Sequence, residues 1–246
     1  MATTNGSFPD FQHSFSATFQ TSTLTRTTSF FAIIVAGGSG SRMKTDVAKQ
    51  FLLLNGKPIL QRTIEQFLAY SPDIPIRLVL PERDLAVWES LCDDYNFHPA
   101  NVTTIIGGTT RFQSVRHGLA SIPTEADTTG LVAVHDGVRP FVSPGTIAVS
   151  FATASHKGSA VTCVAAKDSV RLLGENGHSE PVDRARVRLI QTPQTFRLDW
   201  FRQAFAGPEQ PHFTDCASVL EWAGYPITLI EGDYENIKIT TPDDLK

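Results

Sequence analysis

The chain has 246 residues, of which 41% are hydrophobic, so it can bury a substantial core in one large domain. Its formal net charge of -4 provides no broad basic surface, and nucleic acid is therefore not an expected partner. No apolar stretch approaches the roughly 20 residues that a membrane-spanning helix needs. We expect a protein that binds neither nucleic acid nor a membrane.

The three cysteines, Cys92, Cys163 and Cys216, are odd in number and far apart in the sequence. This pattern matches neither a disulfide framework nor a zinc site, and it suits the reducing cytoplasm. Residues 1–29 are rich in Ser, Thr and Phe and have no helical or strand period, which predicts a disordered leader. The leader partly resembles an organelle transit peptide but has a single arginine, Arg26, so a plastid location is the minor alternative to a cytoplasmic one.

From residue 30 onward, short β-branched runs alternate with amphipathic segments, a pattern typical of βαβ units around a mostly parallel sheet. The continuous apolar run at 30–36 predicts a central strand that is covered on both faces. Further strands are predicted at 76–80, 102–106, 131–134 and 161–166. Helical periods lie after residue 58, around 88–95, at 112–122 and at 144–156.

The sequence becomes polar between residues 167 and 188, and Gly174, Asn176 and Gly177 form a predicted hairpin tip. This predicts a β-arm, at about 167–188, that protrudes from the core. Beyond the arm, the predicted elements are a strand near 189–190, helices at 198–206 and 214–224, and short strands at 227–230 and 237–239. The expected fold is α/β and Rossmann-like, a mostly parallel open sheet with helices on both faces, in one domain at 30–246.

A glycine-rich loop, Ala36-Gly-Gly-Ser-Gly-Ser-Arg42, follows the first predicted strand, where open α/β sheets bind their ligands. Its small residues let backbone N–H groups approach an anion closely, although a plain tight turn is the alternative. Arg42 and Lys49 lie just downstream and can neutralise a polyphosphate. The loop residues expected to hold phosphates are Ala36, Gly37, Gly38, Ser39 and Gly40.

Two familiar phosphate-binding loops are excluded by position. A dinucleotide fingerprint needs a third glycine where this chain has Met43, and no acidic residue follows near Pro58 to take the ribose hydroxyls. A P-loop is absent because the Gly56-Lys57 pair has Phe51 at the required glycine position and Pro58 after it.

Polar residues after two further predicted strands point to the same edge of the sheet. Gly107-Gly108 leads into a helix N-terminus with Arg111 and Ser114, a second place for an anion or a base edge. Asp136 offers a carboxylate for Mg2+ or a hydroxyl, and Arg139 can bind a phosphate, unless the two simply form a loop ion pair.

Two other polar residues sit in apolar surroundings. His135 is better explained as a packed core histidine than as a base. Lys238 lies within a predicted apolar strand and needs an anionic partner, because an unpaired buried ammonium is costly.

Taken together, the motifs resemble those of the 2-C-methyl-D-erythritol 4-phosphate cytidylyltransferase family, and the resemblance covers essentially everything from residue 31 onward. It rests on the glycine-rich loop, Lys49-Gln-Phe51, Gly107-Gly108 with Arg111 and Ser114, His135-Asp-Gly-Val-Arg-Pro140, Val182-Asp-Arg184, Gln191-Thr-Pro-Gln194, Thr214-Asp215 and Asn236-Ile-Lys238. The resemblance implies that CTP and methylerythritol phosphate react, with Mg2+, to give a CDP-alcohol and pyrophosphate.

The resemblance also implies roles for individual residues. Arg42 and Lys49 would stabilise the charge that builds on the α-phosphate, with Arg184 and Lys238 as further catalytic groups. The nucleotide would be held by the glycine-rich loop together with Gly108, Arg111, Ser114, Asp136 and Gly137. The sugar phosphate would be surrounded by Asp136, Arg139, Ser169, Arg184, Thr192, Thr214 and Lys238. Asp136 is the candidate metal ligand, and Arg184 would cross to a second subunit on the arm, which implies a homodimer.

The expected chemistry needs no general base, because a phosphate monoester with a second pKa of about 6 is largely dianionic at neutral pH. Catalysis then reduces to positioning and cationic stabilisation. Cys216 stands where an acidic residue is usual in the family, which predicts weaker substrate positioning. The alternatives are a cytidylyltransferase for ribitol 5-phosphate or another polyol phosphate, and a non-catalytic CTP-binding module.

Overall fold

A computed structural model describes residues 28–37, 47–124 and 130–245 of the chain. The predicted leader lies almost entirely outside these described residues. So do Gly38, Ser39, Gly40 and Arg42, four of the residues that the sequence assigns to phosphate binding.

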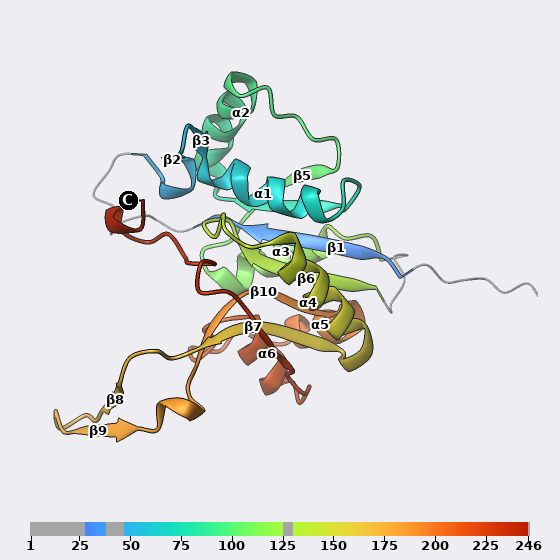
Figure 1. Ribbon diagram of the computed structural model, residues 1–246. Coiled ribbons are helices and arrows are strands. Elements are labelled where there is room, and N and C mark those ends of the chain that lie inside the picture. The colour runs from blue at the N-terminus through green and yellow to red at the C-terminus, as the bar shows by residue number, and fades with distance from the viewer. Residues whose placement is uncertain (1–27, 38–46, 125–129, 246) are drawn as a thin grey trace, which may run out of the picture.

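The core is a seven-stranded sheet with the strand order β11-β7-β10-β6-β1-β4-β5 (Figure 1). Its strands are β1 (Phe30–Val35), β4 (Ile76–Leu80), β5 (Val102–Ile106), β6 (Leu131–Asp136), β7 (Ser159–Ala165), β10 (Arg188–Arg197) and β11 (Leu229–Glu231). β10 runs antiparallel to both of its neighbours, and the other pairs are parallel. The predicted α/β fold with a mostly parallel open sheet is confirmed.

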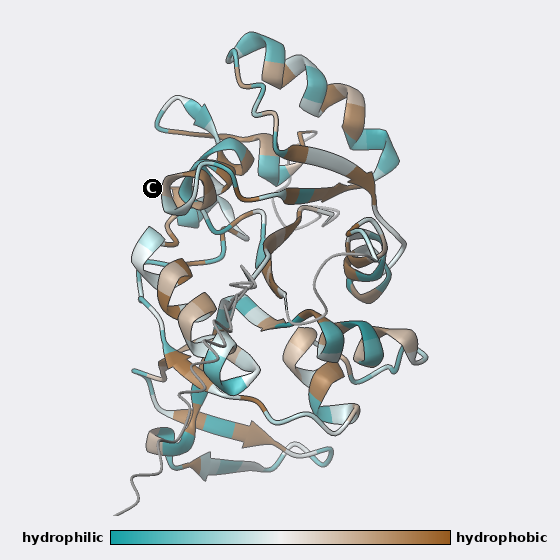
Figure 2. Ribbon diagram, turned by 90° about the vertical axis from the view of Figure 1, so that its right-hand side faces the viewer, coloured by the Kyte–Doolittle hydropathy of each residue, from teal (hydrophilic) through white to brown (hydrophobic). Residues whose placement is uncertain are grey.

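Helices cover both faces of the sheet. One face packs against α1 (Ile59–Tyr70), α2 (Leu85–Asp94) and α4 (Pro144–Lys157), and the other against α3 (Arg111–Ala120), α5 (Leu198–Ala206) and α6 (Cys216–Trp222). In β1, Ile34 joins the first core and Ile33 the second, and both are fully buried. Alternate side chains of a strand face opposite sides, which explains why β1, between two helical layers, is apolar throughout. The strands accordingly appear largely brown in Figure 2.

Shorter elements complete the described chain. They are the 3-10 turns η2 (Lys49–Phe51), η3 (Glu82–Asp84), η4 (Arg184–Arg186) and η5 (Pro242–Leu245), and the small hairpin of β2 (Leu53–Leu54) with β3 (Lys57–Pro58). None of the helices in the described segments has the length and apolar character that a bilayer crossing requires.

Two strand predictions needed correction. β10 is a ten-residue strand and not the short piece predicted near 189–190, because a register shift between Ile190 and Gln194 lets it continue past Pro193. The strand predicted at 237–239 does not form. Ile239 donates one backbone hydrogen bond to the carbonyl of Val138 at 2.9 Å, and this segment joins none of the sheets.

The predicted arm region contains β8 (Val170–Leu173) and β9 (Ser179–Val182), which pair only with each other and project from the body of the molecule (Figure 1). At its tip, Gly177 has a φ of +77°, a conformation that favours glycine. Leu172 and Leu173 are 64% and 77% exposed. An isolated two-stranded hairpin is only marginally stable in water, and these two leucines leave an apolar surface exposed on it.

Candidate functional site

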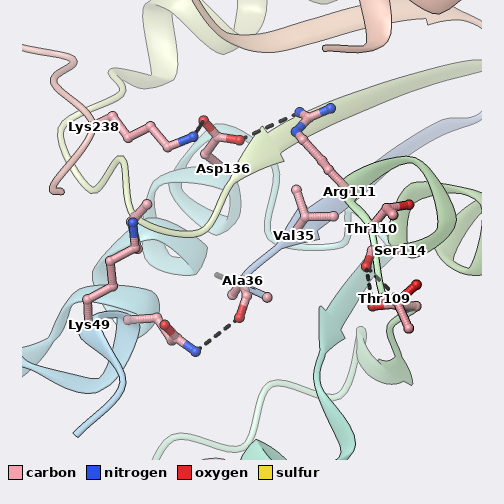
Figure 3. Close-up of a pocket in the computed structure, with 13 residues that line it drawn as sticks. Val35, Ala36, Lys49, Thr109, Thr110, Arg111, Ser114, Asp136 and Lys238 are labelled. Carbon is pink, nitrogen blue, oxygen red and sulfur yellow. Dashed lines mark hydrogen bonds and ion pairs between the residues drawn. The ribbon is translucent and has the colours of Figure 1, made fainter. Parts of the chain in front are cut away.

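Two adjoining pockets open where the carboxyl ends of β1, β5 and β6 meet. The first pocket (Figure 3) is lined by Val35, Ala36, Gly37, Lys49, Gln50, Gly108, Thr109, Thr110, Arg111, Ser114, Asp136, Val138 and Lys238. The second shares Arg111, Asp136 and Lys238 with the first and adds Arg139, Ile190, Gln191, Thr192, Gln194, Thr214 and Asp215. The shared residues make one continuous site from segments that are far apart in sequence.

The carboxylate of Asp136 lies at the centre of this site and contacts three cations. Lys238 Nζ lies 3.1 Å from Asp136 Oδ2, Arg139 Nε lies 3.3 Å from the same oxygen, and Arg111 Nη2 lies 3.6 Å from Oδ1. Figure 3 shows Lys238 and Arg111 reaching Asp136 from opposite sides. Lys238 thus has an anionic partner, Asp136, but the predicted burial of its ammonium in a strand is wrong, because its side chain is 42% exposed.

The three cations determine the charge state of the cluster. Burial by itself raises the pKa of Asp136, but Arg111, Lys238 and Arg139 together hold that pKa well below its usual range. The carboxylate is therefore ionised at neutral pH. Because one negative charge faces three positive charges, the site retains excess positive charge for an anionic ligand.

A chain of hydrogen bonds behind Asp136 fixes its backbone. The Asp136 N–H donates to Thr192 Oγ1 at 3.0 Å, and the same hydroxyl lies 3.0 Å from His135 Nδ1. His135 Nε2 lies 3.2 Å from the carbonyl of Arg139. A carbonyl only accepts, so Nε2 carries the proton and Nδ1 accepts from Thr192. Burial lowers the pKa of His135 to about 4, so the ring is neutral at pH 7, as expected for a packed core histidine.

The start of α3 forms the wall of the first pocket. The Gly108 N–H donates to Ser114 Oγ at 3.1 Å, and the Thr109 N–H donates to Gln113 Oε1 at 3.1 Å. A Cβ on Gly108 would lie 2.3 Å from Gln113 Cβ and 3.2 Å from the Gln113 carbonyl carbon. Position 108 therefore requires glycine for steric reasons.

Several buried amides at the site have contacts that the sequence analysis did not single out. The Asn236 side chain donates through Nδ2 to the backbone carbonyl of Thr192 at 2.8 Å. The backbone carbonyl of Asn236 accepts from Arg139 Nη1 at 2.8 Å. Gln194 caps α6 by accepting from the N–H groups of Cys216 and Ala217. Asn236 and Gln194, and likewise the buried Gln50, belong to sequence motifs noted above. The hydrophobic pattern of the sequence does not reveal which residues a buried amide contacts.

Cys216 lines neither of the two pockets, but its side chain contacts Arg111. Its side chain is fully buried at the start of α6, and Arg111 Nη1 donates to Sγ at 3.2 Å. Burial raises the pKa of the Cys216 thiol, and the neighbouring guanidinium opposes this only in part. The residue therefore bears on the site through the position of Arg111.

Of the predicted site residues that the structure describes, three line neither pocket within one chain. Arg184 and Ser169 are exposed at the arm, and Arg184 Nη1 donates to the carbonyl of Lys167 at 2.7 Å. Gly137 donates its N–H to the carbonyl of Val35 at 2.8 Å, and a Cβ there would lie 2.8 Å from Ala36 Cβ. Gly137 thus allows the loops after β1 and β6 to approach each other.

The metal prediction has limited support from the protein side chains. Among the described residues, no group of three or more His, Cys, Asp or Glu is arranged to hold a metal ion. Asp136 is the carboxylate of the first pocket, and three cations already neutralise it. These residues fit a Mg2+ that takes most of its ligands from substrate phosphates and water.

Comparison with known proteins gives one consistent family. Residues 30–246 match the profile of the family described as 2-C-methyl-D-erythritol 4-phosphate cytidylyltransferase. The chain is 45% identical to the protein of that name from Bacteroides fragilis over 215 residues, which is 87% of this chain and 95% of the relative. It is 46% identical to the namesake from Porphyromonas gingivalis over 216 residues, covering 87% of this chain and 94% of the relative.

Solved structures agree with this grouping. A 4-diphosphocytidyl-2C-methyl-D-erythritol synthase from Anaerococcus prevotii superposes with a TM-score of 0.75 at 26% identity, covering 89% of this chain and 93% of the other. The 2-C-methyl-D-erythritol 4-phosphate cytidylyltransferase from Francisella tularensis superposes with a TM-score of 0.72 at 31% identity, covering 89% and 97%.

The substitution Asp136→Asn should lower the free energy of unfolding by about 3 kcal/mol at neutral pH, because it leaves three cations without their counter-charge. Since the pKa of Asp136 is depressed in the folded state, its contribution is fully present above the unfolded value of about 3.9 and is lost as the pH falls further. Denaturant titrations at neutral and acidic pH would therefore show a difference that shrinks in acid. The exposed Asp73→Asn provides the control, and equal effects of the two substitutions would contradict the prediction.

The substitution Gly108→Ala should destabilise the protein by about 1–3 kcal/mol, because the new methyl group has to displace the start of α3. Gly145→Ala is the matched control, since its Cβ would meet only Ser143 Oγ at an ordinary 3.6 Å. Chemical unfolding of both variants checks this, and parental stability of Gly108→Ala would show that the helix start moves freely.

Proposed function

Because the chain belongs to the 2-C-methyl-D-erythritol 4-phosphate cytidylyltransferase family, we propose that it transfers CMP from CTP to 2-C-methyl-D-erythritol 4-phosphate, giving CDP-methylerythritol and pyrophosphate. The single observation that carries this proposal is the cluster around Asp136, where three cations face one carboxylate between two adjoining pockets. A site with excess positive charge suits a reaction that brings two phosphate-bearing substrates together.

We assign CTP to the first pocket and the acceptor phosphate to the second. Gly108, Ser114, Ala36 and Gly37 line the first, which fits a nucleoside triphosphate whose phosphates would meet Lys49 and the part of the glycine-rich loop outside the described residues. Arg139, Thr192 and Thr214 surround the second. Arg111, Asp136 and Lys238 line both pockets, so the reacting phosphates would meet beside them.

The proposed reaction is a direct displacement. An oxygen of the acceptor phosphate attacks the α-phosphorus of CTP, a new P–O bond forms, and the bond to the bridging oxygen of pyrophosphate breaks. The attacking phosphate is already dianionic, so no proton has to be removed. Lys49, with Arg42 from outside the described residues, would stabilise the charge on the α-phosphate.

Mg2+ is the proposed cofactor, and when bound it would share the charge of the triphosphate oxygens. Asp136 is the protein group nearest to this role. Its carboxylate would otherwise serve to hold Lys238, Arg139 and Arg111 at the junction of the two pockets.

A homodimer through the arm is the proposed assembly. Arg184 and Ser169 are exposed on or beside the projecting hairpin, so they would complete the second pocket only if the arm reached another subunit. The exposed Leu172 and Leu173 support an interface there.

The location and domain organisation are proposed on simpler grounds. The free thiols of Cys92, Cys163 and Cys216 support a cytoplasmic location. The single seven-stranded sheet in the described part of the chain supports one nucleotidyltransferase domain at 30–246.

The substrate assignment is tested by measuring pyrophosphate release with Mg2+ for CTP, ATP, GTP and UTP against methylerythritol phosphate, ribitol 5-phosphate and other polyol phosphates. We expect turnover with CTP and methylerythritol phosphate. A preference for ribitol 5-phosphate would show that it, and not methylerythritol phosphate, is the acceptor substrate. Nucleotide binding without turnover for any acceptor would indicate a binding module instead.

The variants Lys49→Ala and Arg42→Ala should fold normally and lose on the order of a hundredfold in turnover, because each removes a charge that stabilises the transition state. Lys157→Ala is the control, since this exposed lysine ends α4 at the far edge of the sheet. Near-parental turnover of purified Lys49→Ala would refute its catalytic role.

A double substitution, Leu172→Glu with Leu173→Glu, should convert the dimer to a monomer and abolish most turnover, because it places charges in the proposed interface. Sedimentation velocity measures the first effect. Val149→Glu changes a comparably exposed residue on α4, outside the arm, and should leave the dimer intact. A parental chain that sediments as a monomer would overturn the proposed assembly.

A further inference from the structure

Gln50 joins three segments beneath the first pocket. It lies in η2 directly after Lys49, and its side chain is completely buried. Its Nε2 donates to the carbonyl of Ala36, at the start of the glycine-rich loop, at 3.0 Å. The same nitrogen donates at 3.0 Å to Oδ2 of Asp84, the residue before α2. One amide thus ties the turn that carries Lys49 to the end of β1 and to the start of α2.

These two contacts fix the orientation of the amide. Both acceptors are oxygens that cannot donate, since one is a backbone carbonyl and the other the carboxylate of Asp84. Turning the amide over would place Oε1 against both of them, so Nε2 must face Ala36 and Asp84. The orientation leaves Oε1 on the opposite side of the amide.

The Oε1 atom of Gln50 is buried and has no hydrogen-bond partner in the described parts of the chain. Buried acceptors without a partner are rare in folded proteins and call for an explanation. Gln50 lines the first pocket beside Ala36, Gly37 and Lys49.

The neighbouring residues pack η2 against α2. The Phe51 N–H donates to the carbonyl of Ala48 at 2.9 Å, and the Phe51 ring stacks on Trp88 of α2 at a centroid distance of 6.4 Å. Lys49 itself is only 8% exposed. The backbone of Lys49 is therefore located by the buried side chains that follow it.

We infer that Gln50 is a positioning residue of the proposed cytidylyl transfer, and that it acts by holding Lys49 in register with Ala36 at the end of β1. The inference rests on the proposed function, because the reaction is where the position of Lys49 has its effect. Gln50 does not have to touch the reacting atoms. Gln50 affects kcat through the position of Lys49, so its substitution should have little effect on kcat once Lys49 has been removed.

The test is a double-mutant cycle on the full chain with CTP, Mg2+ and methylerythritol phosphate. Gln50→Met keeps the size of the side chain and removes its hydrogen bonds. We expect it to lower kcat by about tenfold or more and to leave KM for the acceptor within about twofold of the parental value. In a Lys49→Ala background, the same substitution should lower kcat by less than about twofold, because the residue through which it acts is gone.

Matched controls separate positioning from general stability. Gln61→Met replaces another buried glutamine, on α1 outside both pockets, and should keep the parental kcat. Asp84→Ala removes the far end of the Gln50 contact and should lower kcat in a way that is not additive with Gln50→Met. Thermal unfolding of every variant shows whether it folds. If Gln50→Met does not fold, Asp84→Ala tests the inference in its place.

The outcomes distinguish the inference from the proposed function. Additive losses for Gln50→Met and Lys49→Ala, or parental kcat for both Gln50→Met and Asp84→Ala, would overturn the positioning role and leave the proposed function standing. A parental chain that does not turn over CTP with any acceptor would overturn the proposed function, and this inference with it.

Discussion

The organisation of the site depends on one buried carboxylate that attracts three cations. Arg111 comes from the start of α3, Arg139 from the loop after β6, and Lys238 from the C-terminal segment, and all three approach Asp136 within 3.6 Å. Without a shared anion, cations at this spacing would repel one another in a low-dielectric environment. The carboxylate therefore gathers them, and because it balances only one of the three charges, it leaves the site able to bind phosphates.

The parallel sheet explains why such distant segments meet. Strands that run in the same direction bring their carboxyl ends to one edge, so Ala36, Gly108 and Val138, which follow β1, β5 and β6, line one pocket although they are far apart in sequence. β10 adds what the parallel strands cannot. It runs antiparallel between β6 and β7, and its irregular register brings Thr192 against the backbone of Asp136. The resulting chain of hydrogen bonds through His135 makes that histidine part of the scaffold.

Among the described residues of one chain, none from the arm lines the second pocket. Arg139, Thr192 and Thr214 line it, whereas Arg184 lies on the arm and contacts the carbonyl of Lys167. The β8–β9 hairpin has exposed leucines and no sheet partner in the described chain.

Local periodicity in the sequence was sufficient to locate β1, β4, β5, α3 and α5, and the composition after the strands singled out Lys49, Gly108, Arg111, Asp136, Arg139 and Lys238, which line the two pockets. These features can be predicted because strand period, helix period and turn composition act over a few residues. The direction and length of β10, the absence of a strand at 237–239, the joining of three cations by Asp136 and the contacts of Gln50 could not be inferred in this way. They depend on hydrogen bonds and ion pairs between residues distant in sequence, and such pairings are established only when the chain packs.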